Sequence, residues 1–153
     1  MNLLDALKQD HDAVKELLQE ILDSEDGKER SELFKTVKTN LTAHSRSEEK
    51  VLYRRLEKSE EGKDEALEGD VEHEVTDHLV ESLARARDKA SDSWTARCTV
   101  LKEILEHHIE EEQGETFATA RKLFDEEQLE KMGEEFAKEK AKHGVKPKAM
   151  AAE

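Results

Sequence analysis

Apolar residues recur every three to four positions along most of this chain, which is the spacing of one face of an α-helix. The pattern predicts four long helices over residues 3–23, 29–58, 65–90 and 94–124. A shorter fifth helix is predicted to begin after Asp125, which forms a capping-box pattern with Gln128, and to end near Lys142. Polar stretches separate these segments, and Asn2 stands where it can cap the first helix. The sequence therefore predicts an all-α fold.

Two of the apolar faces change character halfway along their helices. The face of the second helix continues into His44 and Glu48, and the face of the fourth continues into His108 and Glu112. A carboxylate at a core position is costly unless a partner offsets its desolvation. Residues four apart on a helix can reach the same point in space, so a metal ion could bind both members of each pair.

These pairs belong to an internal repeat. The segment HSRSEEKVLY, from His44 to Tyr53, aligns without a gap with HIEEEQGETF, from His108 to Phe117. The segments DHDAVKELL and EHEVTDHLV also align, and they place His11 and His73 at the same position. The chain is therefore predicted to consist of two helical hairpins. Short connections favour an antiparallel up-down four-helix bundle over residues 3–124, followed by an accessory helix over 125–143 and a flexible tail over 144–153.

The repeat brings together six candidate metal ligands from the four predicted helices. Four imidazoles and two carboxylates suit two borderline divalent metals, with the glutamates placed to bridge them. Iron is the best match, because mixed nitrogen and oxygen ligation that leaves open positions suits non-haem iron and oxygen chemistry. Zinc fits the ligand types equally, and manganese is less favoured by four imidazoles. The predicted ligands are His11, His44, Glu48, His73, His108 and Glu112.

The alternative is that these are ordinary core or surface side chains of a highly charged bundle. His73 has the weakest support from periodicity, because the apolar stripe of its helix was assigned to Val75, Leu79, Leu83 and Ala86. Asp77, four residues after His73, is expected to be a solvated acid, although it could reach the metal or orient an imidazole.

Five other side chains are expected to be structural or solvent-exposed. His107 points about 100° away from His108, so it is predicted to be exposed or to lie behind the ligands. His143 is predicted to be solvated, and His78 is predicted to be structural, with ligation as an alternative. Tyr53 is predicted to pack in the core, with a hydrogen bond or proton donated to the metal site as a minor alternative. Cys98 is predicted to be a buried packing thiol.

Composition limits the possible partners. The net charge of −14 repels nucleic acid and anionic membranes. No apolar run approaches the length of a membrane span, and the N-terminus lacks the basic-then-apolar pattern of an export signal. One cysteine fits a reducing compartment. We therefore expect a cytoplasmic protein, a monomer or weak homo-oligomer, that binds neither nucleic acid nor membrane.

The matched segments resemble the hemerythrin-like proteins of the HHE cation-binding domain family, over about residues 3–124. The resemblance implies a four-helix bundle that holds an oxo- or hydroxo-bridged diiron centre. Glu48 and Glu112 would bridge the irons, and the histidines would be terminal ligands. The oxygen carriers of this family have a histidine at the position of Asp77, and an aspartate one residue after the position of Glu112. These departures argue against reversible oxygen carriage.

The resemblance leaves several functions open. The family includes proteins that bind oxygen or nitric oxide, handle iron, act as sensors or break down peroxide. We expect a small diiron protein of stress response or iron homeostasis whose partner is a diatomic ligand or peroxide. The alternatives are a diiron enzyme with catalase-like activity and an iron storage or buffering protein.

Overall fold

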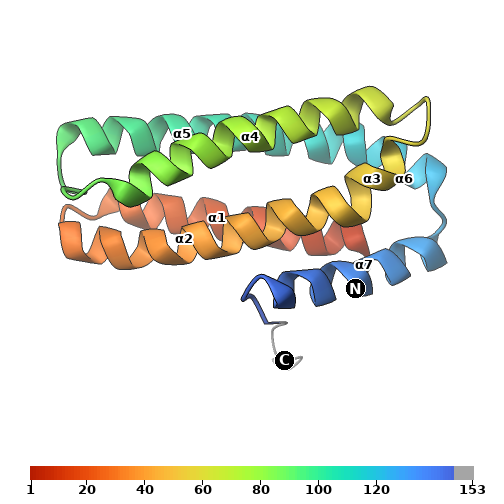
Figure 1. The fold of residues 1–153 in the computed structure, drawn as a ribbon, viewed down its shortest axis with the longest axis horizontal. Helices are drawn as coiled ribbons and strands as arrows, with labels where there is room; N and C mark the ends of the chain where they lie inside the picture. Colours follow the sequence, from red (N-terminus) through yellow and green to blue (C-terminus); the bar gives the residue numbers. More distant parts are fainter. Residues whose placement is uncertain (147–153) are drawn as a thin grey trace.

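The computed structural model describes residues 1–146, and the part of the chain that it describes is all-helical, without strands. Seven α-helices and two short π-helical segments follow one another along the chain (Figure 1). Their bounds are α1 Leu3–Asp23, α2 Gly27–Glu48, η1 Glu49–Tyr53, α3 Arg54–Leu56, α4 Lys63–Arg85, α5 Asp92–Glu111, η2 Glu112–Thr116, α6 Phe117–Leu123 and α7 Glu126–Lys142.

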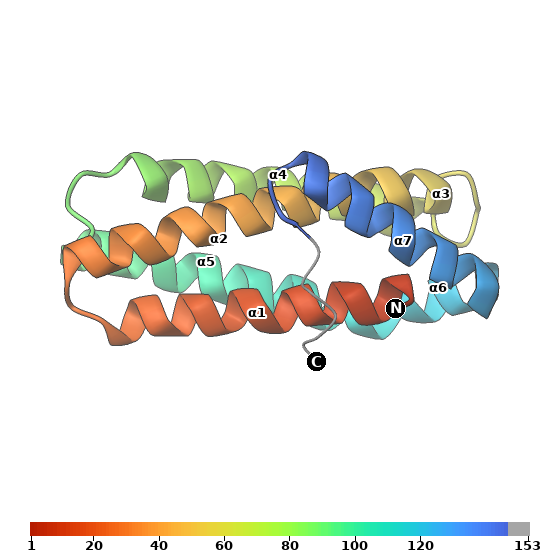
Figure 2. The same cartoon turned by 90° about the horizontal axis from the view of Figure 1, so that it is seen from below.

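The long helices form two neighbouring hairpins. α1 packs against α2 and α4 packs against α5, and the hairpins meet where α1 contacts α5 and α2 contacts α4 (Figure 1). The shorter α7 lies across α1 and α2, outside the four long helices (Figure 2). The arrangement agrees with the helical bundle expected of the resemblance. The predicted division into a bundle and an accessory helix stays a prediction, and residues 147–153 of the predicted tail lie outside the described residues.

The helix starts follow the predicted capping chemistry. The side chain of Asn2 accepts a hydrogen bond from the backbone of Asp5, and the side chain of Ser91 accepts one from Trp94. Asp125 and Gln128 form the predicted capping box of α7. The second helix begins at Gly27 rather than at residue 29, because Asp26 caps it by accepting from the backbone of Lys28.

The third long helix departs from the prediction in length and in phase. It ends at Arg85 rather than at Ala90, because the backbone becomes extended at Ala86. The ammonium group of Lys89 donates to the free carbonyls at this end. Its buried face includes His73, whereas Val75 is 46% exposed. The predicted stripe was wrong at Val75, whereas Leu83 is buried and Leu79 and Ala86 pack against the core. Small and polar residues form most of the buried face, which comprises Ala66, Gly69, His73, Thr76, Val80 and Leu83.

The apolar core is split into two clusters, and the predicted ligands lie between them. Along α1, His11 falls between Leu7 of one cluster and Val14 of the other. α4 follows the same order, whereas α2 and α5 run the opposite way and reach the other cluster only in the segments that follow them, η1 and α6. Apolar contacts therefore hold the bundle on both sides of the candidate ligands, which form a polar level between the two clusters.

Candidate metal centre

Both His–Glu pairs stand where an α-helix changes into a π-helix. The π turns Glu49–Tyr53 and Glu112–Thr116 begin directly after Glu48 and at Glu112. A π turn bonds each residue to the fifth one along rather than the fourth, so it changes which later side chains face the interior. Such turns are frequent at functional sites, and in the repeat alignment these two begin one residue apart.

The structure brings all six predicted ligands together in the bundle interior. The most exposed of them, His108, is 9% exposed, and Glu48 is fully buried. They form two clusters. Within each cluster, the three potential ligand atoms lie within 4.8 Å of one another. The first cluster is His11, His44 and Glu112, and the second is Glu48, His73 and His108.

The two glutamates connect these clusters. Oε1 of Glu112 lies 3.2 Å from Nε2 of His11 in its own cluster, and Oε2 lies 3.7 Å from Nε2 of His108 in the other. Oε1 of Glu48 lies 3.2 Å from Nε2 of His73 and 3.5 Å from Nε2 of His44. Each carboxylate is therefore in contact with histidines of both clusters, as a bridging ligand must be.

A second ring of side chains orients the four imidazoles. His11 Nδ1 lies 2.8 Å from Gln113, His44 Nδ1 lies 2.9 Å from Asp10, His73 Nδ1 lies 2.7 Å from Glu49 and His108 Nδ1 lies 2.6 Å from Glu72. Each partner directly precedes or follows a candidate ligand in the sequence. When the Nδ1–H groups donate to these oxygens, every Nε2 keeps a lone pair that points toward the glutamates.

This orientation leaves buried acceptors facing one another. Within the described chain, both oxygens of Glu48, Oε1 of Glu112 and Nε2 of His108 are buried without a hydrogen-bond partner. A neutral imidazole whose Nδ1 carries the hydrogen cannot donate from Nε2, so the short contacts to the carboxylates pair acceptor with acceptor. Such groups cost free energy when they are buried, and a cation between them removes the cost. The residues present therefore fit a metal site.

The electrostatics of the metal-free site support this conclusion. Burial lowers the pKa of His44, but the neighbouring carboxylates of Asp10 and Glu48, which favour the protonated imidazole, outweigh it and raise the pKa to about 10. The pKa of His73 rises to about 9, because the neighbouring carboxylates of Glu48 and Glu49 likewise outweigh burial. Burial and the charge of Glu48 raise the pKa of Glu112. Without metal the cluster retains protons in place of a cation.

Tyr53 contacts the candidate ligands, which matches the minor alternative of the sequence analysis rather than its main prediction of core packing alone. Its hydroxyl donates to Oε2 of Glu112 at 2.7 Å, and its ring stacks on His73 with centroids 5.2 Å apart. Burial and the charges of Glu48 and Glu112 raise its pKa, so the hydroxyl keeps its proton. The π turn carries Tyr53 toward the interior, and Gly69 leaves room, since a Cβ there would lie 2.5 Å from the tyrosine ring. In the sequence, the signal for this contact was the position of Tyr53 shortly after the His44–Glu48 pair.

The remaining histidines and Asp77 lie outside the two clusters. His107 and His143 are exposed, as predicted, and His78 is exposed rather than structural. Asp77 pairs with Arg46 at 2.9 Å instead of orienting an imidazole. The predicted packing thiol, Cys98, is buried in the apolar cluster that also contains Trp94.

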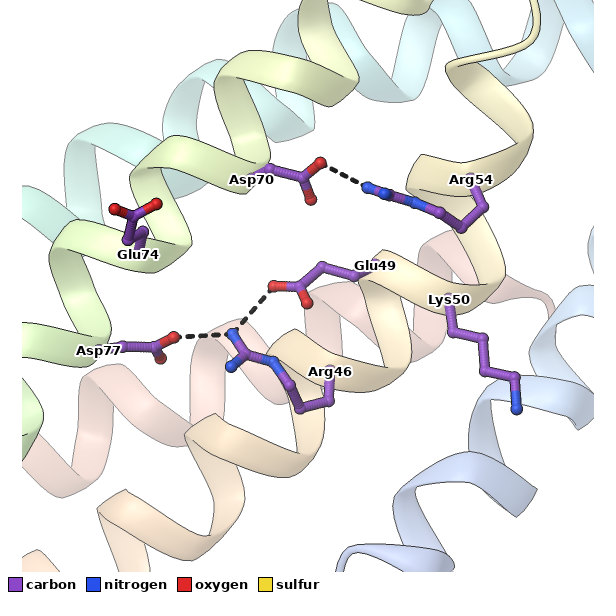
Figure 3. A pocket seen from close by; sticks show the side chains of 7 residues that line it. All are labelled: Arg46, Glu49, Lys50, Arg54, Asp70, Glu74 and Asp77. Atoms are coloured by element: carbon purple, nitrogen blue, oxygen red, sulfur yellow. Dashed lines mark hydrogen bonds and ion pairs between the residues drawn. The ribbon is translucent and has the colours of Figure 1, made fainter.

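A charged groove between α2 and α4 lies next to the second cluster. Figure 3 shows Arg46 between the carboxylates of Glu49 and Asp77, and Arg54 directed at Asp70. Glu49 bonds to Arg46 on one side and to Nδ1 of His73 on the other. One side chain therefore separates this open groove from a buried imidazole.

Comparison with known families agrees with this geometry. The model of the hemerythrin HHE cation binding domain matches residues 2–120. The chain belongs to this family. All six candidate ligands lie within the matched range, and α7 lies beyond it.

One curated relative gives a second comparison. A DNA nickase from Nostoc sp. (strain PCC 7120) is 31% identical over 142 residues, which cover 93% of this chain and 40% of that protein. The chain thus spans well under half the length of this relative. No solved structure matched the chain. In the described part of this hemerythrin-family chain, no helix is long and apolar enough to cross a membrane.

Proposed function

We propose that this chain is a hemerythrin-like non-haem diiron protein that handles oxygen, nitric oxide or peroxide. The observation that carries the proposal is the pair of buried three-residue clusters connected by Glu48 and Glu112. The ligands are His11, His44, Glu48, His73, His108 and Glu112. Their positions on the two hairpins support an antiparallel up-down arrangement of the four long helices.

The protein's own residues set the conditions in the site. The four braced imidazoles direct Nε2 inward, and Glu48 and Glu112 supply the negative charge that two cations need. Bound iron would supply redox chemistry and open coordination positions. The apolar clusters on both sides exclude bulk water from this level of the bundle.

Peroxide breakdown is the second candidate, and Tyr53 is the observation that favours it. Its hydroxyl is a buried proton donor 2.7 Å from Glu112, at a site that otherwise consists of acceptors. A proton held at this atom can be given to a small oxygen species and regained.

Two measurements separate these candidates. Protein reconstituted with iron is first mixed with nitric oxide or oxygen, and the optical spectrum is followed for a stable, reversible change. The same protein is then mixed with hydrogen peroxide, and oxygen release is followed with an electrode. Sustained release supports the enzyme, and a spectral change without turnover supports the binding protein. Neither response, with iron bound, would contradict both.

The name of the Nostoc relative raises DNA cleavage as another function. That activity is stated for a protein of which this chain spans 40%, and the net charge of −14 opposes contact with phosphates. Diiron chemistry is the function that the buried residues support best.

A further inference from the structure

Helix α7 lies outside the matched family range but reaches the candidate metal centre. It is anchored on α1 and α2 by the buried side chains of Leu129, Met132 and Phe136. Gly133 lets it approach the chain closely, because a Cβ there would clash with the backbone from Met1 to Leu3. Figure 2 shows the helix crossing over this part of the bundle. Apolar packing therefore contributes to the position of α7 in addition to the contacts of its charged residues.

A chain of hydrogen bonds leads from α7 to a candidate ligand. The ammonium group of Lys140 lies 2.7 and 2.9 Å from the two carboxylate oxygens of Asp10. Asp10 in turn accepts from Nδ1 of His44 at 2.9 Å. The side chains of Lys140 and Asp10 are only 17% and 21% exposed, so solvent screens the pair less than it would a surface pair.

The same helix also contacts the imidazole directly. The ring of Phe136 meets the ring of His44 edge to face, with centroids 5.7 Å apart. Lys140 also contacts Phe136, since its Nζ lies over the phenylalanine ring, 5.1 Å from the ring centroid. His44 is thus held by α7 in two ways, once through Phe136 and once through Asp10.

The equivalent histidine of the other hairpin has no such support. The partner of His108 is Glu72, whose side chain is 36% exposed. Within residues 1–146, no lysine or arginine forms an ion pair with Glu72. The two halves of the repeat are therefore braced differently, and the difference is supplied by α7, which packs on α1 and α2.

We propose that Lys140 is a positioning residue of the metal centre, which fixes the ring of His44 by holding the carboxylate of Asp10. Helix α7 thereby slows loss of metal from the cluster of His11, His44 and Glu112. This inference rests on the proposed function, because it requires a metal at that cluster.

The test follows iron release from four single variants and one double variant of the full chain. Anaerobic protein loaded with Fe²⁺ is mixed with an excess of a chromogenic Fe²⁺ chelator, and the rate of colour formation is recorded. The variants are Lys140→Met, Lys140→Arg, Asp10→Ala, Lys142→Met and the combination of Lys140→Met with Asp10→Ala. Lys142 is the matched control, because it is a 69% exposed lysine of α7 whose ion-pair partner among residues 1–146 is Glu139.

We expect Lys140→Met to speed release of the first iron by roughly threefold to tenfold. This is less than the about 10–100-fold loss of metal affinity that is typical when a side chain in direct contact with a ligand is removed, because Lys140 acts through Asp10. Lys140→Arg should restore slow release, and Lys142→Met should match the wild type. In the Asp10→Ala background, Lys140→Met should have no further effect. A simple loss of stability would instead act in both backgrounds.

The outcomes separate the two proposals. Wild-type protein that takes up no iron would overturn the proposed function together with this inference. Iron-loaded protein whose release is unchanged by Lys140→Met would overturn the inference alone. An equal acceleration by Lys142→Met, or one that persists without Asp10, would also overturn it.

Discussion

The hydroxyl of Tyr53 donates to Oε2 of Glu112 at 2.7 Å, and this hydrogen bond connects the π turn of one hairpin to the candidate ligand of the other. Both side chains are buried. The contact therefore links the two halves of the repeat at the level of the metal centre.

Replacing Tyr53 with phenylalanine should destabilise the protein modestly. The variant leaves a buried carboxylate oxygen without its donor, which costs about 1–3 kcal/mol in the metal-free protein. Denaturant unfolding of the apo forms measures the difference. The cost should be smaller in the iron-loaded forms, because a metal can still satisfy Glu112. Equal unfolding free energies of the apo wild type and variant would contradict the structural role of the hydrogen bond.

Gly69→Ala tests the close packing of α4 on Tyr53. The new methyl group would lie 2.5 Å from the tyrosine ring, so the ring must move, at a cost of about 1–3 kcal/mol. Gly114→Ala is the control, since no atom lies within 4 Å of a Cβ at that position. We expect the control to be neutral or stabilising, because alanine favours helix more than glycine does. Thermal melting measures the stability of both variants. A Gly69→Ala variant with the melting temperature of the wild type would show that Tyr53 does not pack against Gly69 as described.

His107 and His108 provide a test of helix phase. His108 faces Glu112 and is buried, whereas the side chain of His107 is 71% exposed and pairs with Glu111. We expect His108→Ala to lose metal from its cluster and His107→Ala to keep the wild-type metal content. Elemental analysis of the two reconstituted variants measures this directly. The opposite result would show that the phase assigned to α5 is wrong.

The sequence predicted the elements with strong periodicity and strong capping signals. The first helix begins and ends at the predicted residues, Leu3 and Asp23, and the predicted capping box of Asp125 and Gln128 is present. Repeat alignment recovered His73, which periodicity alone placed poorly because the buried face of α4 has few large apolar residues. All six candidate ligands come together in space, although their binding of metal stays a prediction.

Other features depended on tertiary structure. The π turns changed the phase after each glutamate, so the contact between Tyr53 and Glu112 could not be read from α-helical spacing. At the end of α4, the ammonium group of Lys89 satisfies three backbone carbonyls, a contact that no local pattern indicates. The ring of partners around the imidazoles joins different elements of the bundle, and no local pattern indicates which acid faces which histidine.

Metal removal should loosen the whole bundle, and Cys98 can report it. Its thiol is fully buried, and burial raises its pKa to about 11, so at pH 8 it is protonated and unreactive in the folded protein. A metal at roughly 100–1,000 times its dissociation constant adds about 3–4 kcal/mol of stability. We therefore expect chelation of the metal to lower the melting temperature and to speed thiol labelling at pH 8. Labelling at the same rate with and without metal would contradict this coupling.

The most direct test of the account is the metal content of the reconstituted protein. Six ligands in two clusters that share Glu48 and Glu112 predict about two iron ions per folded chain, by analogy with other carboxylate-bridged bundles. Elemental analysis after anaerobic iron loading and desalting measures this number, with Glu48→Ala as the matched variant. The account predicts about two irons in the wild type and a clear loss in the variant. A fully folded wild type with substantially fewer than two, or a Glu48→Ala protein with undiminished iron, would contradict it.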